Sequence, residues 1–161
     1  MRRLTISVRA CTETMGLLLA MAWADGKLQD EEKQGIRDAS STLNLPKEFR
    51  ERLEKLMQQA PPLAELKVEG LPTREREFAF VASAWMANVA AGIDEREEAL
   101  LKAIGDKLEL SDVRQGELAG LALDLPPPDE GESWSEGLVR LFKTIPAKVE
   151  PSLEESEVEF E

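Results

Sequence analysis

The sequence predicts an all-α fold in which two pseudo-repeated three-helix units form one helical bundle, followed by a proline-rich linker and an acidic C-terminal tail. Three observations support this prediction. Residues 22–32 (AWADGKLQDEE) correspond to residues 87–97 (ANVAAGIDERE) about 65 positions later, and the correspondence continues without a gap. Apolar residues recur at helical spacing in both copies. No stretch alternates convincingly between polar and apolar residues as a strand does.

The first unit begins with an apolar helix over residues 5–24. Asp25 and Gly26 end this helix, because glycine adopts the left-handed turn after a helix at little cost. A second helix runs from Asp30 to about residue 43, and its acidic start offsets the free N–H groups there. Pro46 suits the first turn of a third helix, which ends before the prolines at 61 and 62.

The second unit repeats this order after a connection over residues 61–72 that contains one short turn. Thr73 is a suitable N-cap for its first helix. Asp94 with Glu97 matches a capping box before its second helix. The three helices of this unit are expected over residues 74–91, 95–109 and 112–124.

The last quarter of the chain lies outside the repeat. Residues 125–131 (LPPPDEG) mark a clear break, and proline-rich runs of this kind stiffen a chain. Residues 134–145 follow with an amphipathic pattern that predicts one more short helix. The remaining residues are too polar to offset the cost of ordering, so we expect disorder in isolation. The predicted divisions are 1–124, 125–145 and 146–161.

The negative charge of the chain disfavours two classes of partner. The net charge is −12, and residues 124–161 hold 3 basic and 11 acidic side chains. Such a balance argues against general nucleic-acid binding, which needs clustered Lys and Arg. It also argues against docking on an anionic membrane. The longest apolar run, over residues 15–24, is too short to cross a bilayer, so we expect no membrane insertion and a cytoplasmic location.

The residue types present also argue against common enzyme chemistry. The chain has no histidine and one cysteine, Cys11. The commonest acid–base residue, the imidazole metal ligand and the Ser–His or Cys–His nucleophile are therefore absent. We interpret Cys11 as a helix residue that faces the core. The sequence contains no recognisable catalytic motif, so we predict that the protein is not an enzyme.

The repeated motif resembles that of the TerB-like (tellurite-resistance B) superfamily. The resemblance rests on ADGKLQDEE and TLNLPKE in the first unit and on GIDEREEALLKAIGDKLELSD in the second, and it covers about residues 5–124. It implies an all-helical bundle with internal pseudo-twofold symmetry. It also implies a place in bacterial stress systems, no catalytic activity, and a metal-binding role for the acidic loops. The second copy has Ala90-Ala91 where the first has Asp25-Gly26.

The acidic junctions admit two interpretations. If the two junctions meet across the pseudo-twofold axis, their carboxylates could converge on a hard cation such as Ca²⁺ or Mg²⁺. Acidic residues at helix starts also serve as ordinary caps. Lys27 occupies a place where an EF-hand loop needs an oxygen ligand, which favours capping. The candidate metal ligands are Asp25, Asp30, Glu32, Asp94 and Glu97.

The C-terminal segments supply candidate partner-binding residues. Trp134 follows a polar break, so it caps the bundle or docks a partner. Val158 and Phe160 alternate with glutamates, which suits the addition of a strand to a partner's sheet edge. A purely solubilising acidic tail is the alternative. The candidate residues are Trp134, Leu138, Phe142, Leu153, Val158 and Phe160.

These observations predict a non-catalytic helical scaffold of a bacterial stress-response system that binds a protein partner through its surface and its acidic C-terminal segment. The alternative is a protein that binds a divalent metal through the acidic helix starts. The sequence identifies neither the partner nor the oligomeric state.

Overall fold

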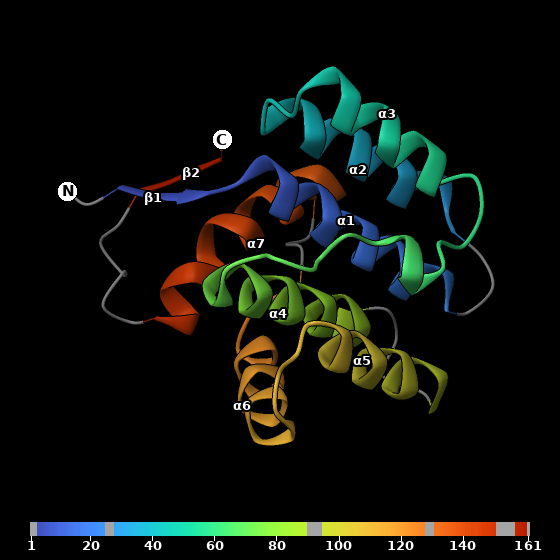
Figure 1. Cartoon of the computed structure of the whole chain (residues 1–161). Coiled ribbons are helices and arrows are strands. Elements are labelled where there is room, and N and C mark those ends of the chain that lie inside the picture. Colours follow the sequence, from blue (N-terminus) through green and yellow to red (C-terminus); the bar gives the residue numbers. More distant parts are fainter. Residues whose placement is uncertain (1–2, 25–27, 90–94, 128–130, 151–156, 161) are drawn as a thin grey trace.

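The computed structural model describes residues 3–24, 28–89, 95–127, 131–150 and 157–160. These residues form seven α-helices, one short 3-10 helix and two short strands, so the all-α fold class is confirmed (Figure 1). In chain order the elements are β1 (Arg3–Ile6), α1 (Val8–Trp23), α2 (Asp30–Thr42), α3 (Lys47–Leu56), η1 (Leu63–Glu65), α4 (Thr73–Val89), α5 (Glu95–Lys107), α6 (Asp112–Leu123), α7 (Trp134–Val149) and β2 (Glu157–Phe160).

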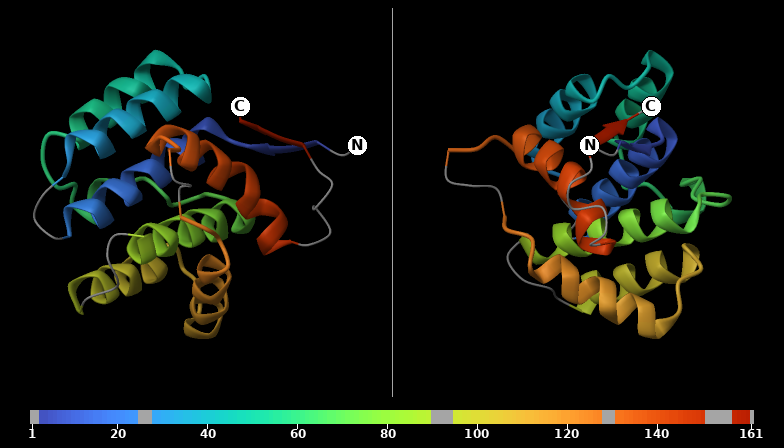
Figure 2. Two further views of the ribbon diagram at one scale, coloured as in Figure 1. Left: turned by 180° about the vertical axis from the view of Figure 1, so that it is seen from behind. Right: turned by 90° about the vertical axis from the view of Figure 1, so that its left-hand side faces the viewer.

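The helices stack in layers around α1 and α4. Helices α2 and α3 lie on one side of α1, and α5 and α6 lie beyond α4 on the other (Figures 1 and 2). Every residue of α1 from Ala10 to Ala22 is buried, because this helix is apolar on nearly all sides. Gly16 lets the side chain of Leu66 approach α1 closely. The core therefore runs along α1 and α4.

The two helix pairs α2–α3 and α5–α6 have matching joints. Asn44 and Glu109, which are 65 positions apart, both adopt a left-handed backbone with φ values of 57° and 60°. The amides of Leu45 and Leu110 donate to the carbonyls of Ser40 and Gly105, respectively. The wider packing differs, since α2 packs mainly on α7 whereas α5 packs on α4 and α1. The repetition of whole units therefore stays a prediction.

The short helix expected over residues 134–145 is present as α7, which packs within the bundle and continues to Val149, where a disordered tail was expected from residue 146. It runs through Pro146 to Val149 and packs along α2. A Cβ atom on Gly35 would lie 2.5 Å from Cβ of Trp134, so glycine is required for this close approach. Ile145 and Pro146 are both buried, and this burial offsets the poor helix propensity of proline.

The two ends of the described chain pair with each other, which corrects the expectation that no strand forms. Strands β1 and β2 are parallel, with Leu4 opposite Val158 and Ile6 opposite Phe160. They lie side by side at one end of the bundle (Figure 2). The segment in which Val158 and Phe160 alternate with glutamates therefore pairs with a strand of the same chain. No helix in the described ranges is both long enough and apolar enough to span a membrane.

Candidate functional site

The first acidic helix start acts mainly as a cap. The amide of Gln29 donates to Oε1 of Glu32 over 3.3 Å, as the N-terminal turn of α2 requires. Asp30 is exposed, with Nζ of Lys33 at 4.0 Å. Of the second start, Glu97 is buried at 7% exposure. Asp25 and Asp94 lie outside the described residues.

The described residues do not form a metal site. Within the ranges that the structure covers, no three Asp, Glu, Cys or His side chains come close enough to hold an ion. The two acidic helix starts also have different neighbours, because α2 packs on α7 and α5 packs on α4. The divalent-cation hypothesis depends on Asp25 and Asp94, so it stays a prediction.

The expected docking residues of α7 face inward. Leu138 and Phe142 are buried, and Phe142 meets the ring of Phe78 edge-on at a centroid distance of 5.1 Å. Trp134 is half-buried and meets Trp85 edge-on at 6.2 Å. In this structure Trp134 therefore caps the bundle. Leu138 and Phe142 do not present a docking surface, because α7 packs against α2 and α4.

Two of the three expected docking residues of the tail lie in β2, and the third is outside the described residues. Leu153 lies outside the described residues. Val158 and Phe160 belong to β2 and are half-buried, and the ring of Phe160 lies 6.4 Å from that of Phe142. The alternating segment adds a strand to a sheet as the sequence suggested, but the strand beside it is β1 of the same chain.

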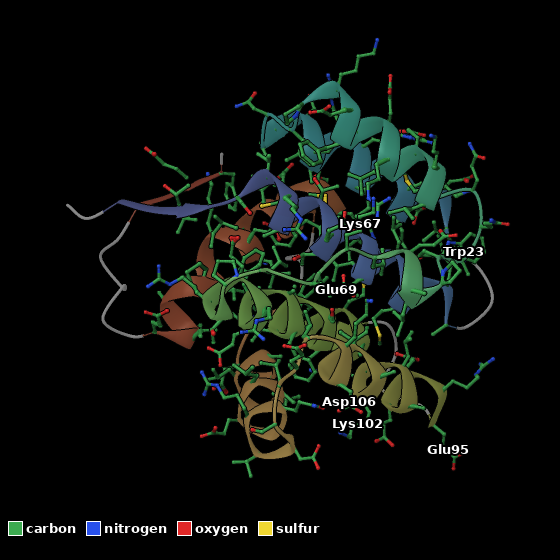
Figure 3. All side chains as sticks on the ribbon, viewed as in Figure 1. Trp23, Lys67, Glu69, Glu95, Lys102 and Asp106 are labelled. Carbon is green, nitrogen blue, oxygen red and sulfur yellow. The ribbon has the colours of Figure 1, made fainter. Side chains whose placement is uncertain are left out.

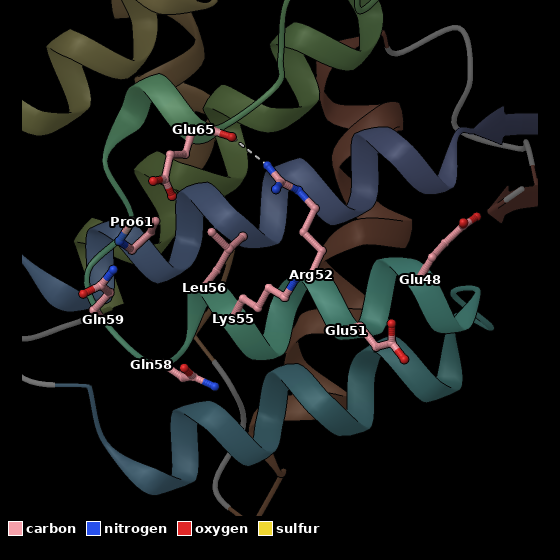
Figure 4. A pocket seen from close by; sticks show the side chains of 9 residues that line it. All are labelled: Glu48, Glu51, Arg52, Lys55, Leu56, Gln58, Gln59, Pro61 and Glu65. Atoms are coloured by element: carbon pink, nitrogen blue, oxygen red, sulfur yellow. Dashed lines mark hydrogen bonds between the residues drawn. The ribbon is translucent and has the colours of Figure 1, made fainter.

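A buried ion pair that sequence reasoning missed holds α1 to α3. Glu13 is 2% exposed, and both its carboxylate oxygens accept hydrogen bonds of 2.8 Å from the guanidinium of Arg52. The amide of Lys67 donates to the same carboxylate. Arg52 also donates to the carbonyl of Glu65 (Figure 4). An isolated Glu in an apolar helix is a signal for such a pair, since buried charge requires a partner.

The cavity beside Arg52 has a volume of about 400 Å³ and is open to solvent. Arg52 is committed to Glu13, and the residues around the cavity include no Ser, Cys or His that could serve as a nucleophile or base (Figure 4). They are Glu48, Glu51, Arg52, Lys55, Leu56, Gln58, Gln59, Pro61 and Glu65. The cavity therefore offers a polar surface without a catalytic arrangement.

Cys11 is a core residue, as its surroundings in the sequence indicated. Its side chain is fully buried. Burial raises the pKa of the thiol, and the nearby carboxylate of Glu75 raises it further. Glu75 itself accepts a hydrogen bond of 2.8 Å from Oγ of Ser7. The thiol stays protonated and unreactive at neutral pH.

Helix α6 is fixed firmly by its inner side. Leu118 is fully buried against α4, and Arg114 forms two hydrogen bonds with the carboxylate of Glu77. The amide group of Gln115 fits against Gly105 and donates to the carbonyl of Leu110 over 2.9 Å.

Lys102 connects the start of α6 to α5. Its Nζ lies 2.6 Å from Asp106 and 2.5 Å from Asp112, and Figure 3 shows Lys102 and Asp106 at the surface of α5. These contacts between exposed side chains connect α6 to α5 at the edge of the bundle.

The outer side of α6 is exposed to solvent and partly apolar. Val113 is 76% exposed and Leu123 is 70% exposed, and they are the exposed large hydrophobic residues of the described chain. Gly116 and Gly120 are also exposed. At 3.6 residues per turn these four residues fall within an arc of about 80°. We call this strip, made of Val113, Gly116, Gly120 and Leu123, the α6 outer face.

Sequence reasoning did not find the α6 outer face. Two apolar rows run along α6, and helical spacing alone does not tell which row faces the core. Leu118 and Ala122 are buried, which leaves Val113 and Leu123 outside. The pair of glycines four residues apart was the available signal.

Comparisons of the chain with protein-family models, with curated proteins and with solved structures found no match. The likeness to TerB-like domains therefore rests on the repeated motif alone. The function has to be argued from the geometry of the molecule.

Proposed function

We propose that the chain is a non-catalytic helical module that binds a protein partner through the α6 outer face, and that the partner contributes a basic amphipathic helix. The observation that carries the proposal is the exposure of Val113 and Leu123 on one face of a helix whose other face packs on α4. Exposed apolar residues that gather on one face mark interaction sites more often than scattered ones do.

The two glycines support close approach of a partner backbone. Apart from the neighbouring backbone of α6 itself, a Cβ atom added at Gly116 or Gly120 would have no atom of the described chain within 4 Å. No packing contact inside the molecule therefore requires glycine at either position. A glycine within a helix costs about 0.5–1 kcal/mol relative to alanine. Small residues four positions apart let two helices approach closely, and this benefit would offset the cost.

The charges beside the strip determine the kind of partner. Glu117 and Asp124 lie along one side of the α6 outer face and Asp112 lies along the other, by helical geometry. Lys102 pairs with Asp112, and Arg114 pairs with Glu77 and lies 3.6 Å from Glu117, so these two cations offset only part of the acidic charge. A second copy of the chain would bring like charges together. A helix with an apolar seam and flanking Lys or Arg is complementary.

A probe helix tests the proposal. The probe is a labelled synthetic peptide of about five turns with a Leu and Ala seam and lysines on both flanks. Its binding to the full chain is followed by fluorescence anisotropy. We expect saturable binding, weaker than nanomolar because one helix face is smaller than the roughly 800 Å² per partner of a standard interface. Val113→Ser with Leu123→Ser should weaken binding at least about tenfold.

The controls separate specific docking from charge attraction. Glu48→Ser with Lys55→Ser alters exposed positions on α3, which lies on the opposite side of the molecule from α6 (Figure 1). This variant should bind the probe as the parent does. A probe with glutamates in place of lysines should not bind. Equal binding by the parent and by the Val113/Leu123 variant would overturn the proposal.

The proposed setting is a bacterial stress-response system of the TerB-like kind. This part of the proposal is supported by the motif in residues 24–32 and its second copy in residues 92–112. Co-purification of the chain with stress-system proteins from its own cells, lost in the Val113/Leu123 variant, tests the setting. Its absence would leave the binding surface but remove the setting.

A further inference from the structure

The last strand of the described chain, β2, lies on the surface formed by β1 and α7, much as a bound peptide would. Strand β2 has four residues, and its main contacts are with β1 and α7. The side chains of Val158, Glu159 and Phe160 all keep some exposure. A two-stranded sheet of this length is marginal in isolation. The strand therefore owes its place mainly to the surface beneath it.

That surface is apolar and preformed. Ile6, which lies opposite Phe160 in the parallel register, is 0% exposed. Phe142 is 0% exposed as well, and the centroid of its ring lies 6.4 Å from that of Phe160 and 5.1 Å from that of Phe78. Ile6 and Phe142 would gain exposure if β2 left. The surface requires an extended occupant with apolar residues at alternate positions.

The charges favour an acidic occupant. Strand β1 carries one charged residue, Arg3, which lies opposite Glu157 in the parallel register, and it contains no acidic residue. The strand that pairs with β1 reads EVEF, with an acid at every second position. Opposite charges on neighbouring strands favour pairing, and like charges oppose it. The occupant seen in the structure thus shows the chemistry that β1 selects.

We propose that β1 together with Phe142 of α7 is an acceptor for an extended segment of alternating acidic and apolar residues from another protein, and that β2 occupies this acceptor as a built-in competitor. Addition of a strand to an exposed edge is a common way to recognise peptides. A tethered strand has an effective concentration of about millimolar. The acceptor therefore responds only to a partner that outcompetes β2.

A peptide with the sequence of residues 151–161 (PSLEESEVEFE) is the probe for this acceptor. Its labelled form is titrated into the full chain and into the full-length variant Phe160→Ala. The variant should keep the fold, because Phe160 is only half-buried and lies in a four-residue strand outside the helices, but its own strand has lost the aromatic anchor. We expect the variant to bind the peptide about tenfold more tightly than the parent.

Control peptides and variants decide whether the acceptor is specific. A peptide of the same composition with Val and Phe adjacent should bind poorly, and so should one with lysines in place of glutamates. Adding Ile6→Ala to Phe160→Ala should lower the affinity again, because Ile6 forms the floor of the acceptor. Amide shifts in the bound state should centre on Thr5 and Ile6.

Three results would overturn the proposal. The first is equal affinity of the peptide, or no binding, in the parent and in Phe160→Ala. The second is tighter binding of the lysine peptide. The third is a parent chain that sediments as a dimer with β2 exchanged between copies, which would make a second copy the occupant.

Discussion

Alanine at positions 116 and 120 should stabilise the chain. Both glycines lie within α6, and a Cβ atom at either position would meet no atom of the described chain within 4 Å beyond the neighbouring backbone of α6 itself. Each substitution should therefore recover about 0.5–1 kcal/mol of helix stability without a steric penalty. For the pair we expect about 1–2 kcal/mol. A chain of this size gains about 2–4 °C in Tm per kcal/mol, so Tm should rise by roughly 2–8 °C.

The same double variant should bind the lysine-flanked probe helix more weakly. The added methyl groups of Gly116→Ala and Gly120→Ala stand where the proposed partner backbone approaches. Thermal unfolding followed by circular dichroism and anisotropy titration are measured on the same sample. Stability and binding are expected to change in opposite directions, which general damage to the fold does not produce.

Gly35→Ala is the matched control, because the same substitution at this position should lower Tm rather than raise it. Its Cβ atom would lie 2.5 Å from Cβ of Trp134, so α2 and α7 would have to move apart. Overpacking of this kind costs about 1–3 kcal/mol, and Tm should fall. A lower Tm for the Gly116/Gly120 variant, or probe binding equal to that of the parent, would refute the reasoning.

Three further predictions concern charged groups. Arg52→Leu leaves Glu13 buried without its guanidinium and should lower the free energy of unfolding by about 3–5 kcal/mol, measured by urea titration; a loss below about 1 kcal/mol would contradict this. The pKa of Glu150 lies below its usual value because Arg74 hydrogen-bonds to its carboxylate. The stabilisation is complete above the unfolded pKa of about 4.5 and is lost as pH falls through the lowered pKa, so Arg74→Gln should lower Tm at pH 7 but not near pH 2. A Tm difference that persists near pH 2 would contradict this account. Millimolar Ca²⁺ or Mg²⁺ should leave Tm unchanged if the acidic helix starts act as caps, whereas a saturable rise that Asp30→Asn removes would establish a metal site.

The helices were predictable because their limits depend on local chemistry. Ser111 caps α6, with its Oγ accepting from the amide of Arg114 over 3.1 Å. Asn44 takes the left-handed turn that separates α2 from α3, whereas α3 ends at Leu56, earlier than the prolines at 61 and 62 indicated. Each of these signals acts within a few residues, so one sequence suffices to recognise it.

The strand pair was not predictable in this way. Residues 157–160 alternate as a strand should, but the sequence does not reveal that their partner begins at Arg3. Thr5 and Ile6 also come just before an apolar helix, which favoured their assignment to that helix. Pairing between chain ends is a non-local choice and leaves no local signal.

The candidate site was missed for a related reason. Leu138 and Phe142 have the amphipathic pattern of a docking helix, and only the packing of α2 and α4 on α7 shows that they are inside. Val113 and Leu123 have the pattern of a core row, and they are outside. The periodicity of apolar residues predicts that a helix has an apolar face, but it does not predict which element, if any, packs against that face.

The measurement that tests the central claim most directly is a map of methyl and amide NMR shifts of the full chain as the lysine-flanked probe helix is added. We predict shifts that centre on Val113, Gly116, Gly120 and Leu123 and leave the exposed residues of α3 unchanged. Shifts that centre on another surface, or no saturable shifts at all, would contradict the assignment of the α6 outer face as the docking surface.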